Sequence, residues 1–188
     1  DNKDPDFNLI KSVAKECTMP FGYGGGINNV KDASKIIVSG AEKIILGEAI
    51  FHKPGLINEI SNNLGSQSVA AVLNYKKNLF GKHNLYVQNG GKKINDSIEN
   101  TLMKCQNEGA GELILYNIDR DGTRQGYDFS LIDLVYPNIT VPISIIGGVG
   151  DGSHFDMAEK RYDIIGMGAG SFFTLVGKYK AVLINYSV

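Results

Sequence analysis

The chain has 188 residues, a formal net charge of −1 at pH 7, 43% hydrophobic residues and 21% charged residues. These values are ordinary for a globular domain. The net charge indicates neither the basic surface of a nucleic-acid-binding protein nor a polybasic membrane patch. We therefore expect no nucleic-acid partner and no membrane partner. Cys17 and Cys105 form no CxxC motif, and the three histidines lack metal-ligand spacing. We therefore expect a reduced, cytoplasmic protein without a metal site or other cofactor. No apolar run approaches the ~20 residues that a membrane span needs.

The first predicted element is a helix. Asp4 and Pro5 form a helix-start signal, and Phe7, Ile10 and Cys17 follow at helical spacing. Short apolar runs then alternate with helical patterns, in the order strand 19–23, helix 31–39, strand 42–47, helix 54–63 and strand 69–74.

The alternation continues after an insert at 75–94, which is predicted to form a small hairpin because apolar and polar residues alternate between glycines. The later elements are helix 95–108, strand 112–117, helix 128–136, strand 141–146, helix 153–161 and strand 163–168. Strands that are apolar throughout, each followed by a helix, indicate βα units around a buried parallel sheet.

Two stretches of the chain repeat each other. "MPFGYGGGI" aligns with "VPISIIGGV", and "ILGEAIF" aligns with "GAGSFF" at the same offset. This offset is about 122 residues, half of the ~250 that a (βα)8 TIM barrel typically contains. The repeat therefore predicts a half-barrel internal symmetry. By this count the chain is a single, incomplete barrel domain over 1–188, an N-terminally truncated fragment that covers about strands three to eight. An open flavodoxin-like sheet is the alternative.

Glycine-rich loops follow several predicted strands. In a TIM barrel the loops after the strands form the catalytic face, and phosphate commonly binds after strands seven and eight, where bare backbone N–H groups can approach it closely. The predicted phosphate or substrate contacts are Gly24, Gly25, Gly26, Gly147, Gly148, Ala169, Gly170 and Ser171. Two such sites, related by the internal repeat, predict a long substrate with a phosphate at each end. For the triple glycine, a flexible turn is the alternative.

The stretch "YNIDRDGTRQGYD" follows the predicted strand 112–117. Asp119 and Asp121 flank Arg120, and Gly122 and Thr123 offer a backbone amide and a hydroxyl. At the carboxyl end of a barrel strand these groups are expected to bind substrate, with Asp121 as a catalytic candidate. An Asp-Gly turn with solvated charges is the alternative.

The motifs "PFGYGGGI", "GSQSVAAV", "GAGELILYNIDRDGTRQGYD", "PISIIGGVG" and "AGSFF" resemble the cyclase subunit of imidazole glycerol phosphate synthase, of histidine biosynthesis. The resemblance implies a (βα)8 barrel and a lyase of the glutamine amidotransferase type. Such an enzyme receives ammonia through a channel from a glutaminase subunit and acts on a bisphosphorylated sugar derivative. The tail "GKYKAVLINY" and the hairpin "KKNLFGKHNLYV" are instead similar to a paralogue that works with a glutaminase in amidating surface-glycan sugars.

Two residues depart from the family pattern. The resemblance places a catalytic aspartate at Asn74, and an amide cannot exchange a proton as a carboxylate does. Glu48 stands where the family has a small hydroxyl residue near a phosphate, and a carboxylate there is repulsive. A non-catalytic barrel that keeps its partner-binding face is therefore a third interpretation.

The resemblance also implies a partner face with an ammonia gate at the opposite end of the barrel. It assigns Lys43 and Glu112, at strand starts, to the charged gate, and Glu42 and Gln67 to the docking surface. Ordinary surface charge at strand beginnings is the alternative.

Overall fold

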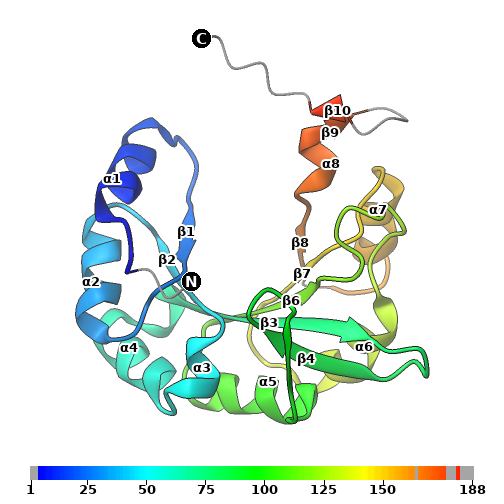
Figure 1. The fold of residues 1–188 in the computed structure, drawn as a ribbon, viewed down its shortest axis with the longest axis horizontal. Helices are drawn as coiled ribbons and strands as arrows, with labels where there is room; N and C mark the ends of the chain where they lie inside the picture. Colours follow the sequence, from blue (N-terminus) through cyan, green and yellow to red (C-terminus); the bar gives the residue numbers. More distant parts are fainter. Residues whose placement is uncertain (1–3, 164, 177–180, 183–188) are drawn as a thin grey trace.

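The computed structural model describes residues 4–163, 165–176 and 181–182. Its main feature is a curled sheet of six parallel strands in the order β1-β2-β3-β6-β7-β8, with helices along its convex side (Figure 1). The six strands are β1 (Gly22–Gly24), β2 (Lys43–Leu46), β3 (Val69–Lys77), β6 (Glu112–Asn117), β7 (Ile143–Ile146) and β8 (Gly166–Gly168). Each strand pairs with the next strand of the series in parallel register.

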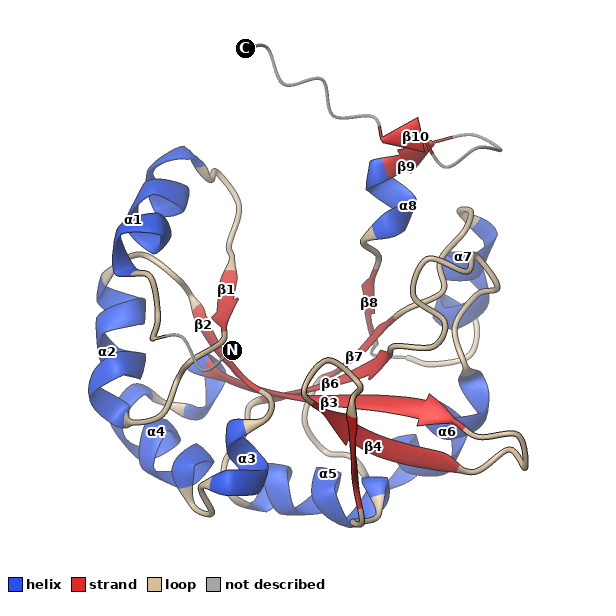
Figure 2. Cartoon of the chain, in the orientation of Figure 1, coloured by secondary structure: helices blue, strands red, loops and turns tan. Residues whose placement is uncertain are grey.

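Helices connect these strands, as Figure 2 shows. They are α1 (Phe7–Glu16), α2 (Val30–Val38), α3 (Ala49–His52), α4 (Leu56–Leu64), α5 (Ile98–Asn107), α6 (Phe129–Val135), α7 (Ser153–Glu159) and α8 (Ser171–Thr174), with 3-10 turns at Ser66–Ser68 and Tyr136–Asn138. Side chains that accept backbone N–H groups cap four of them at their N-termini: Asp6, Asn29, Ser97 and Asp128. In the described part of the chain, no helix combines the length and apolar character that crossing a membrane requires.

The predicted insert is a meander that grows out of β3. The strand runs on past Asn74 to Lys77 and pairs in antiparallel register with β4 (His83–Val87), which pairs with β5 (Lys92–Ile94). The predicted hairpin is therefore confirmed and gains a third strand. In Figure 1 it projects sideways from the curled sheet.

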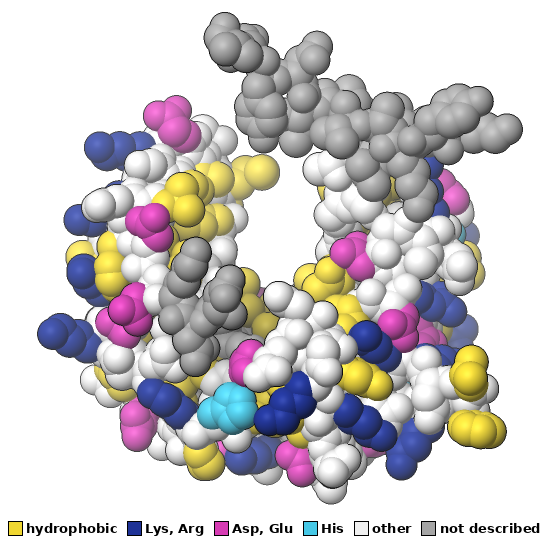
Figure 3. All heavy atoms as spheres, viewed as in Figure 1, with side chains coloured by type: hydrophobic (Ala, Val, Ile, Leu, Met, Phe, Trp, Pro, Cys, Tyr) yellow, Lys and Arg dark blue, Asp and Glu magenta, His cyan; other side chains and the backbone are white. Residues whose placement is uncertain are grey.

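The two faces of the sheet differ in their packing. On β3, Ala71 and Leu73 are fully buried in the core beneath the helices, whereas Val72 and Asn74 are half-buried and face the concave side. β2 and β7 show the same alternation. The concave side is open in the space-filling view (Figure 3).

This order confirms the prediction of a TIM-barrel-type fold. In a flavodoxin-like sheet the strand order reverses at a switch point, whereas here each new parallel strand adds beside the previous one, so that alternative is wrong. Among the described residues, β1 and β8 each have a strand on one side only.

Several local predictions need correction. The first strand starts at Gly22 rather than at residue 19, and α3 was not predicted. After the four-residue α8 the chain forms a short antiparallel pair of β9 (Leu175–Val176) and β10 (Ala181–Val182). The glycan-paralogue tail "GKYKAVLINY" lies outside the described residues except for 181–182.

Candidate functional site

The carboxyl ends of the parallel strands lie along one edge of the curled sheet. This edge therefore brings together the loops after β1, β3, β6, β7 and β8, and with them most of the predicted site residues. We call it the carboxyl edge. It is where TIM barrels place their chemistry.

The loop after β1 owes its three glycines to two different causes. At Gly24 a Cβ would press on the Ile45 side chain and carbonyl of β2, so close strand packing requires glycine there. Gly25 and Gly26 have φ of +126° and +68°, in the region that glycine tolerates best. A Cβ at Gly25 would meet nothing within 4 Å, so the backbone there borders open space, as a close approach to a ligand requires.

The loop after β6 is held in shape by two side chains that bind backbone. The Asn117 Oδ1 accepts the N–H groups of Asp119 and Arg120, each at 3.2 Å. The Arg120 Nη1 donates to the carbonyl oxygens of Gly126 and Tyr127, each at 2.9 Å. We call this segment, 117–127, the Arg120 loop. The sequence singled out its acidic residues, but the structure shows that Arg120 closes it.

Thr123 also stabilises the Arg120 loop. Its hydroxyl donates to the Arg120 carbonyl oxygen at 2.8 Å, while Asp119 and Asp121 stay exposed at the rim. Gly122, with φ +71°, has open space around a Cβ position. The loop is therefore ordered and presents its carboxylates outward.

A tyrosine that sequence reasoning missed accompanies Asp121. The Tyr116 hydroxyl donates to the Asp121 Oδ2 at 2.7 Å. Burial, followed by the hydrogen bond and charge of Asp121, raises the pKa of Tyr116 to about 12, so the phenol is protonated at neutral pH. Tyr116 is the register partner of Asn74 across the β3–β6 pair, which places the tyrosine beside the position predicted to be catalytic.

The two glycines after β7 pack two loops together. Gly147 and Gly148 have φ of +106° and +104°. A Cβ would lie less than 3.0 Å from the Asn117 carbonyl oxygen at the first and from the Gly126 carbonyl oxygen at the second. The Gly126 N–H also donates to the Gly148 carbonyl at 2.7 Å. These glycines thus seat the Arg120 loop against β7, and their predicted contact with phosphate remains a prediction.

The third predicted phosphate loop, from Ala169 to Ser171, leads into α8. Gly170 has open space at its Cβ position. Phe172 packs edge-on against Phe155, whereas Phe173 is 66% exposed.

Glu48 lies beyond β2, at the start of α3. Its Oε1 lies 3.3 Å from the His52 Nε2, one turn along the helix. Glu48, which departs from the family pattern, is thus half-exposed and has His52 as its partner.

The opposite ends of the strands carry the predicted partner face. Lys43 of β2 and Glu112 of β6 form an ion pair on the concave side, across the intervening β3. Ser144 of β7, which the sequence analysis did not single out, donates to the Glu112 Oε1 at 2.6 Å. Glu42 and Gln67 lie at strand starts nearby and are exposed.

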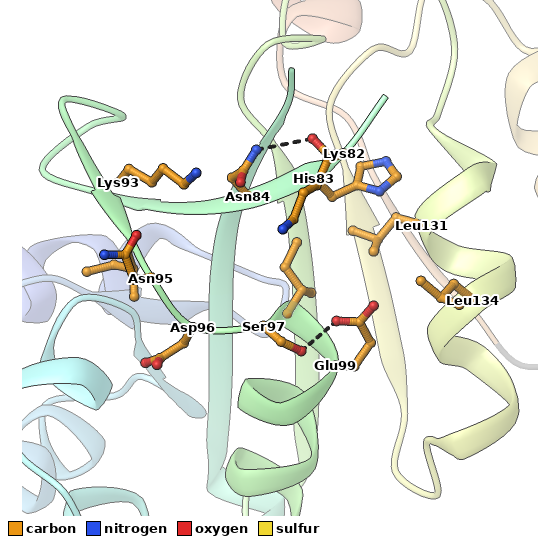
Figure 4. Close-up of a pocket in the computed structure, with 12 residues that line it drawn as sticks. Lys82, His83, Asn84, Lys93, Asn95, Asp96, Ser97, Glu99, Leu131 and Leu134 are labelled. Carbon is orange, nitrogen blue, oxygen red and sulfur yellow. Dashed lines mark hydrogen bonds between the residues drawn. The ribbon is translucent and has the colours of Figure 1, made fainter. Parts of the chain in front are cut away.

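One cavity lies beside the meander. It has a volume of about 470 Å³ and lies between the meander, the start of α5 and α6 (Figure 4). None of the predicted site residues lines it. Its walls mix charges of both signs, with Lys82 and Lys93 opposite Asp96 and Glu99.

A buried polar cluster joins the meander to α6. The Asp128 side chain is 3% exposed. Its Oδ2 lies 3.0 Å from the His83 Nε2, and its Oδ1 accepts a hydrogen bond from the Ser130 hydroxyl. The Lys77 Nζ lies 3.8 Å from the same carboxylate. Burial raises the pKa of the Asp128 carboxyl, but the hydrogen bonds and nearby positive charge outweigh it and leave the pKa far below its usual range. Among the described residues no three His, Cys, Asp or Glu side chains gather as a metal site would require.

The comparisons with known proteins agree with this architecture. A family model described as histidine biosynthesis protein matches residues 1–179. A protein of Leptospira interrogans, provisionally named imidazole glycerol phosphate synthase subunit HisF, is 40% identical over 187 residues, which cover 99% of this chain and 74% of the relative.

Two further relatives extend the pattern. A Vibrio vulnificus protein, provisionally named subunit hisF3 of the same synthase, is 40% identical over 185 residues, 97% of this chain and 71% of the relative. The imidazole glycerol phosphate synthase subunit HisF of a Thermotoga species is 36% identical over 147 residues, 78% of this chain and 58% of the relative. The chain therefore belongs to the histidine biosynthesis protein family and is a HisF-like member of it.

Proposed function

We propose that the protein is the cyclase subunit of an imidazole glycerol phosphate synthase. It would be a lyase that uses ammonia from a glutaminase partner on a bisphosphorylated, sugar-derived substrate in histidine biosynthesis. The observation that carries this proposal is the carboxyl edge, where three glycine-rich loops and the Tyr116–Asp121 pair follow parallel strands of one sheet. The HisF relatives of the chain support it.

The proposed chemistry divides between two side chains. Asp121 is the general base, because a carboxylate at the rim can take a proton from substrate. Tyr116 stays protonated, and by donating its one hydroxyl hydrogen to the Asp121 Oδ2 it orients this carboxylate. Asn74 next to them orients substrate by hydrogen bonds and exchanges no proton.

We also propose that the complete domain is a closed (βα)8 barrel in which two further strands fill the gap between β1 and β8. The one-sided pairing of these strands among the described residues supports this, as does the 71–74% coverage of the relatives with 40% identity. Experiments are therefore designed for the full-length protein.

The test is a cyclase assay with ammonium and the ribulosyl bisphosphate substrate, following imidazole glycerol phosphate. We expect product from the native protein and a rate lower by about a hundredfold or more in Asp121→Asn, the usual loss for a general base. Asp163→Asn, an exposed aspartate at the opposite edge, should leave the rate unchanged. Equal rates in the two variants would show that Asp121 is not the general base.

The glutaminase partner is proposed to dock at the end of the barrel that carries Glu42, Lys43, Gln67 and Glu112. Because Glu112 binds both Lys43 and Ser144, Glu112→Gln should disturb the gate and leave the carboxyl edge intact. We expect the glutamine-driven rate to fall roughly tenfold relative to the ammonium-driven rate, a typical coupling between sites. A parallel fall in both rates would contradict the gate.

A second candidate function is favoured by Asn74, an amide at the position where the family resemblance places a catalytic aspartate. It is the amidation of surface-glycan sugars, again with a glutaminase. Product from Asn74→Asp alone would mean that the pocket fits the histidine-pathway substrate but lacks its base. Failure of both the native protein and this variant would favour the glycan substrate, or a non-catalytic barrel if the protein still activates its glutaminase.

A further inference from the structure

The meander differs in charge from the rest of the chain. Segment 75–94 contains five lysines and no acidic residue, although the whole chain has a net charge of −1. The lysines are Lys76, Lys77, Lys82, Lys92 and Lys93. Among the described residues Lys77 is the one of these that forms an ion pair, with Asp128, and Lys76 lies over the Tyr86 ring. The meander is therefore a basic projection on a slightly acidic protein.

The tip of this projection is apolar. Leu79 and Phe80, in the turn between β3 and β4, are 102% and 95% exposed. The space-filling view shows hydrophobic side chains next to basic ones at the outer end of the meander (Figure 3). Two fully exposed large apolar side chains in sequence cost solvation and indicate a surface with a partner.

The turn is built to hold these side chains outward. The Asn78 Oδ1 accepts the N–H groups of Phe80 and Lys82, at 3.0 and 2.9 Å. The Asn78 backbone pairs with Lys82 and Gly81 at 2.9 Å each. Leu79 and Phe80 therefore project from an ordered turn and contribute nothing to the core.

We propose that this tip docks on an anionic lipid bilayer, with Leu79 and Phe80 inserted among the acyl chains. The lysines next to the turn, Lys76, Lys77 and Lys82, would lie at the level of the headgroups. An apolar tip above a basic collar is the arrangement that interfacial membrane binding needs. Lys77 and Lys82 each lie one residue away from the apolar pair, separated from it by Asn78 and Gly81, and long lysine side chains reach back to charged headgroups.

Two observations favour a lipid surface over a protein partner. The apolar tip comprises two side chains, whereas a stable protein interface covers about 800 Å² on each side. The meander also starts beyond Asn74, at the carboxyl edge, and thus lies away from Glu42 and Gln67 of the proposed glutaminase face. The proposal does not depend on the proposed function, and it revises the expectation, drawn from the overall charge, that the protein has no membrane partner.

The sequence offers a direct probe, since the 188 residues contain no tryptophan. In full-length Phe80→Trp the added indole should show a blue shift of its emission, relative to the parent protein, with phosphatidylcholine–phosphatidylglycerol vesicles. Vesicles of phosphatidylcholine alone should produce none. No shift with either vesicle would overturn the proposal. A shift caused by the glutaminase in the absence of lipid would assign the tip to a protein partner and overturn it too.

Co-sedimentation with the same vesicles separates the two contributions. Leu79→Ser with Phe80→Ser should weaken binding by about tenfold or more, because both anchors are lost, and Lys82→Gln by about fivefold. Val38→Ser is the control, since Val38 is 86% exposed but lies on α2. Equal binding by the tip variant and the control would contradict insertion. An unchanged thermal unfolding midpoint would show that the tip variant is folded.

Discussion

Replacing Gly148 by alanine is expected to destabilise the protein by about 3 kcal/mol or more, because two penalties coincide there. The residue has φ +104°, a conformation that an L side chain rarely adopts. The new Cβ would also lie less than 3.0 Å from the Gly126 carbonyl oxygen, which is backbone and cannot rotate away. The measurement is the free energy of unfolding of the full-length protein by urea denaturation.

Gly122→Ala is the matched control. Gly122 also has a positive φ, +71°, but nothing lies within 4 Å of its Cβ position, so the conformational cost of about 1–2 kcal/mol stands alone. The difference between the two variants measures the contact between the Arg120 loop and the loop after β7. Equal destabilisation would mean that this contact does not form in solution.

The second large effect is expected at Asp128. Asp128→Ala should lower the free energy of unfolding by about 3–5 kcal/mol, the usual cost of removing one partner from a buried ionic cluster. The change removes the carboxylate that lies 3.0 Å from the His83 Nε2, which keeps only the 3.4 Å contact with the Ser130 hydroxyl. It also removes the N-cap of α6, where Asp128 accepts the Ser130 N–H at 3.2 Å. Thermal unfolding followed by circular dichroism would measure the loss.

Asp133→Ala provides the comparison on the same helix. Asp133 binds Arg161 and Tyr162 at the surface, with 42% of its side chain exposed, and exposed pairs contribute little. Its loss should be clearly smaller than that of Asp128→Ala. If the two losses were equal, the Asp128 cluster would not be buried as described.

The same cluster predicts a sensitivity to acid. The pKa of Asp128 is lower in the folded protein than in the unfolded chain, so its contribution is complete above about pH 4 and is lost as the pH falls further. Asp128→Asn should flatten this part of the stability curve. If the free energy of unfolding of the variant falls with acid as steeply as that of the native protein, other carboxylates cause the sensitivity.

Much of the fold could be predicted from the sequence, because buried parallel strands and amphipathic helices have strong local patterns. The strand predicted at 112–117 and the helix predicted at 128–136 agree with β6 and α6 to within a residue. α3 and β5 were missed because four and three residues are too short for a periodic signal. Tertiary contacts decide such elements.

The candidate site could be predicted less fully, because its key contacts join residues through space. The glycine loops and Asp121 stand out in the sequence. The hydrogen bond between Tyr116 and Asp121, and the role of Ser144 beside Glu112, depend on which face of a strand each side chain takes. The sequence shows only that the histidines lack metal-ligand spacing, yet His83 lies in β4 with its Nε2 3.0 Å from the Asp128 Oδ2.

The way in which the Arg120 loop is closed has a consequence for protein engineering. Its shape depends on the Asn117 amide and the Arg120 guanidinium, both of which bind backbone atoms. The exposed rim positions Asp119 and Gln125 lend no side chain to that closure. Libraries randomised at these two positions should therefore sample new substrate preferences on an unchanged frame, so that selection acts on recognition and not on loop folding.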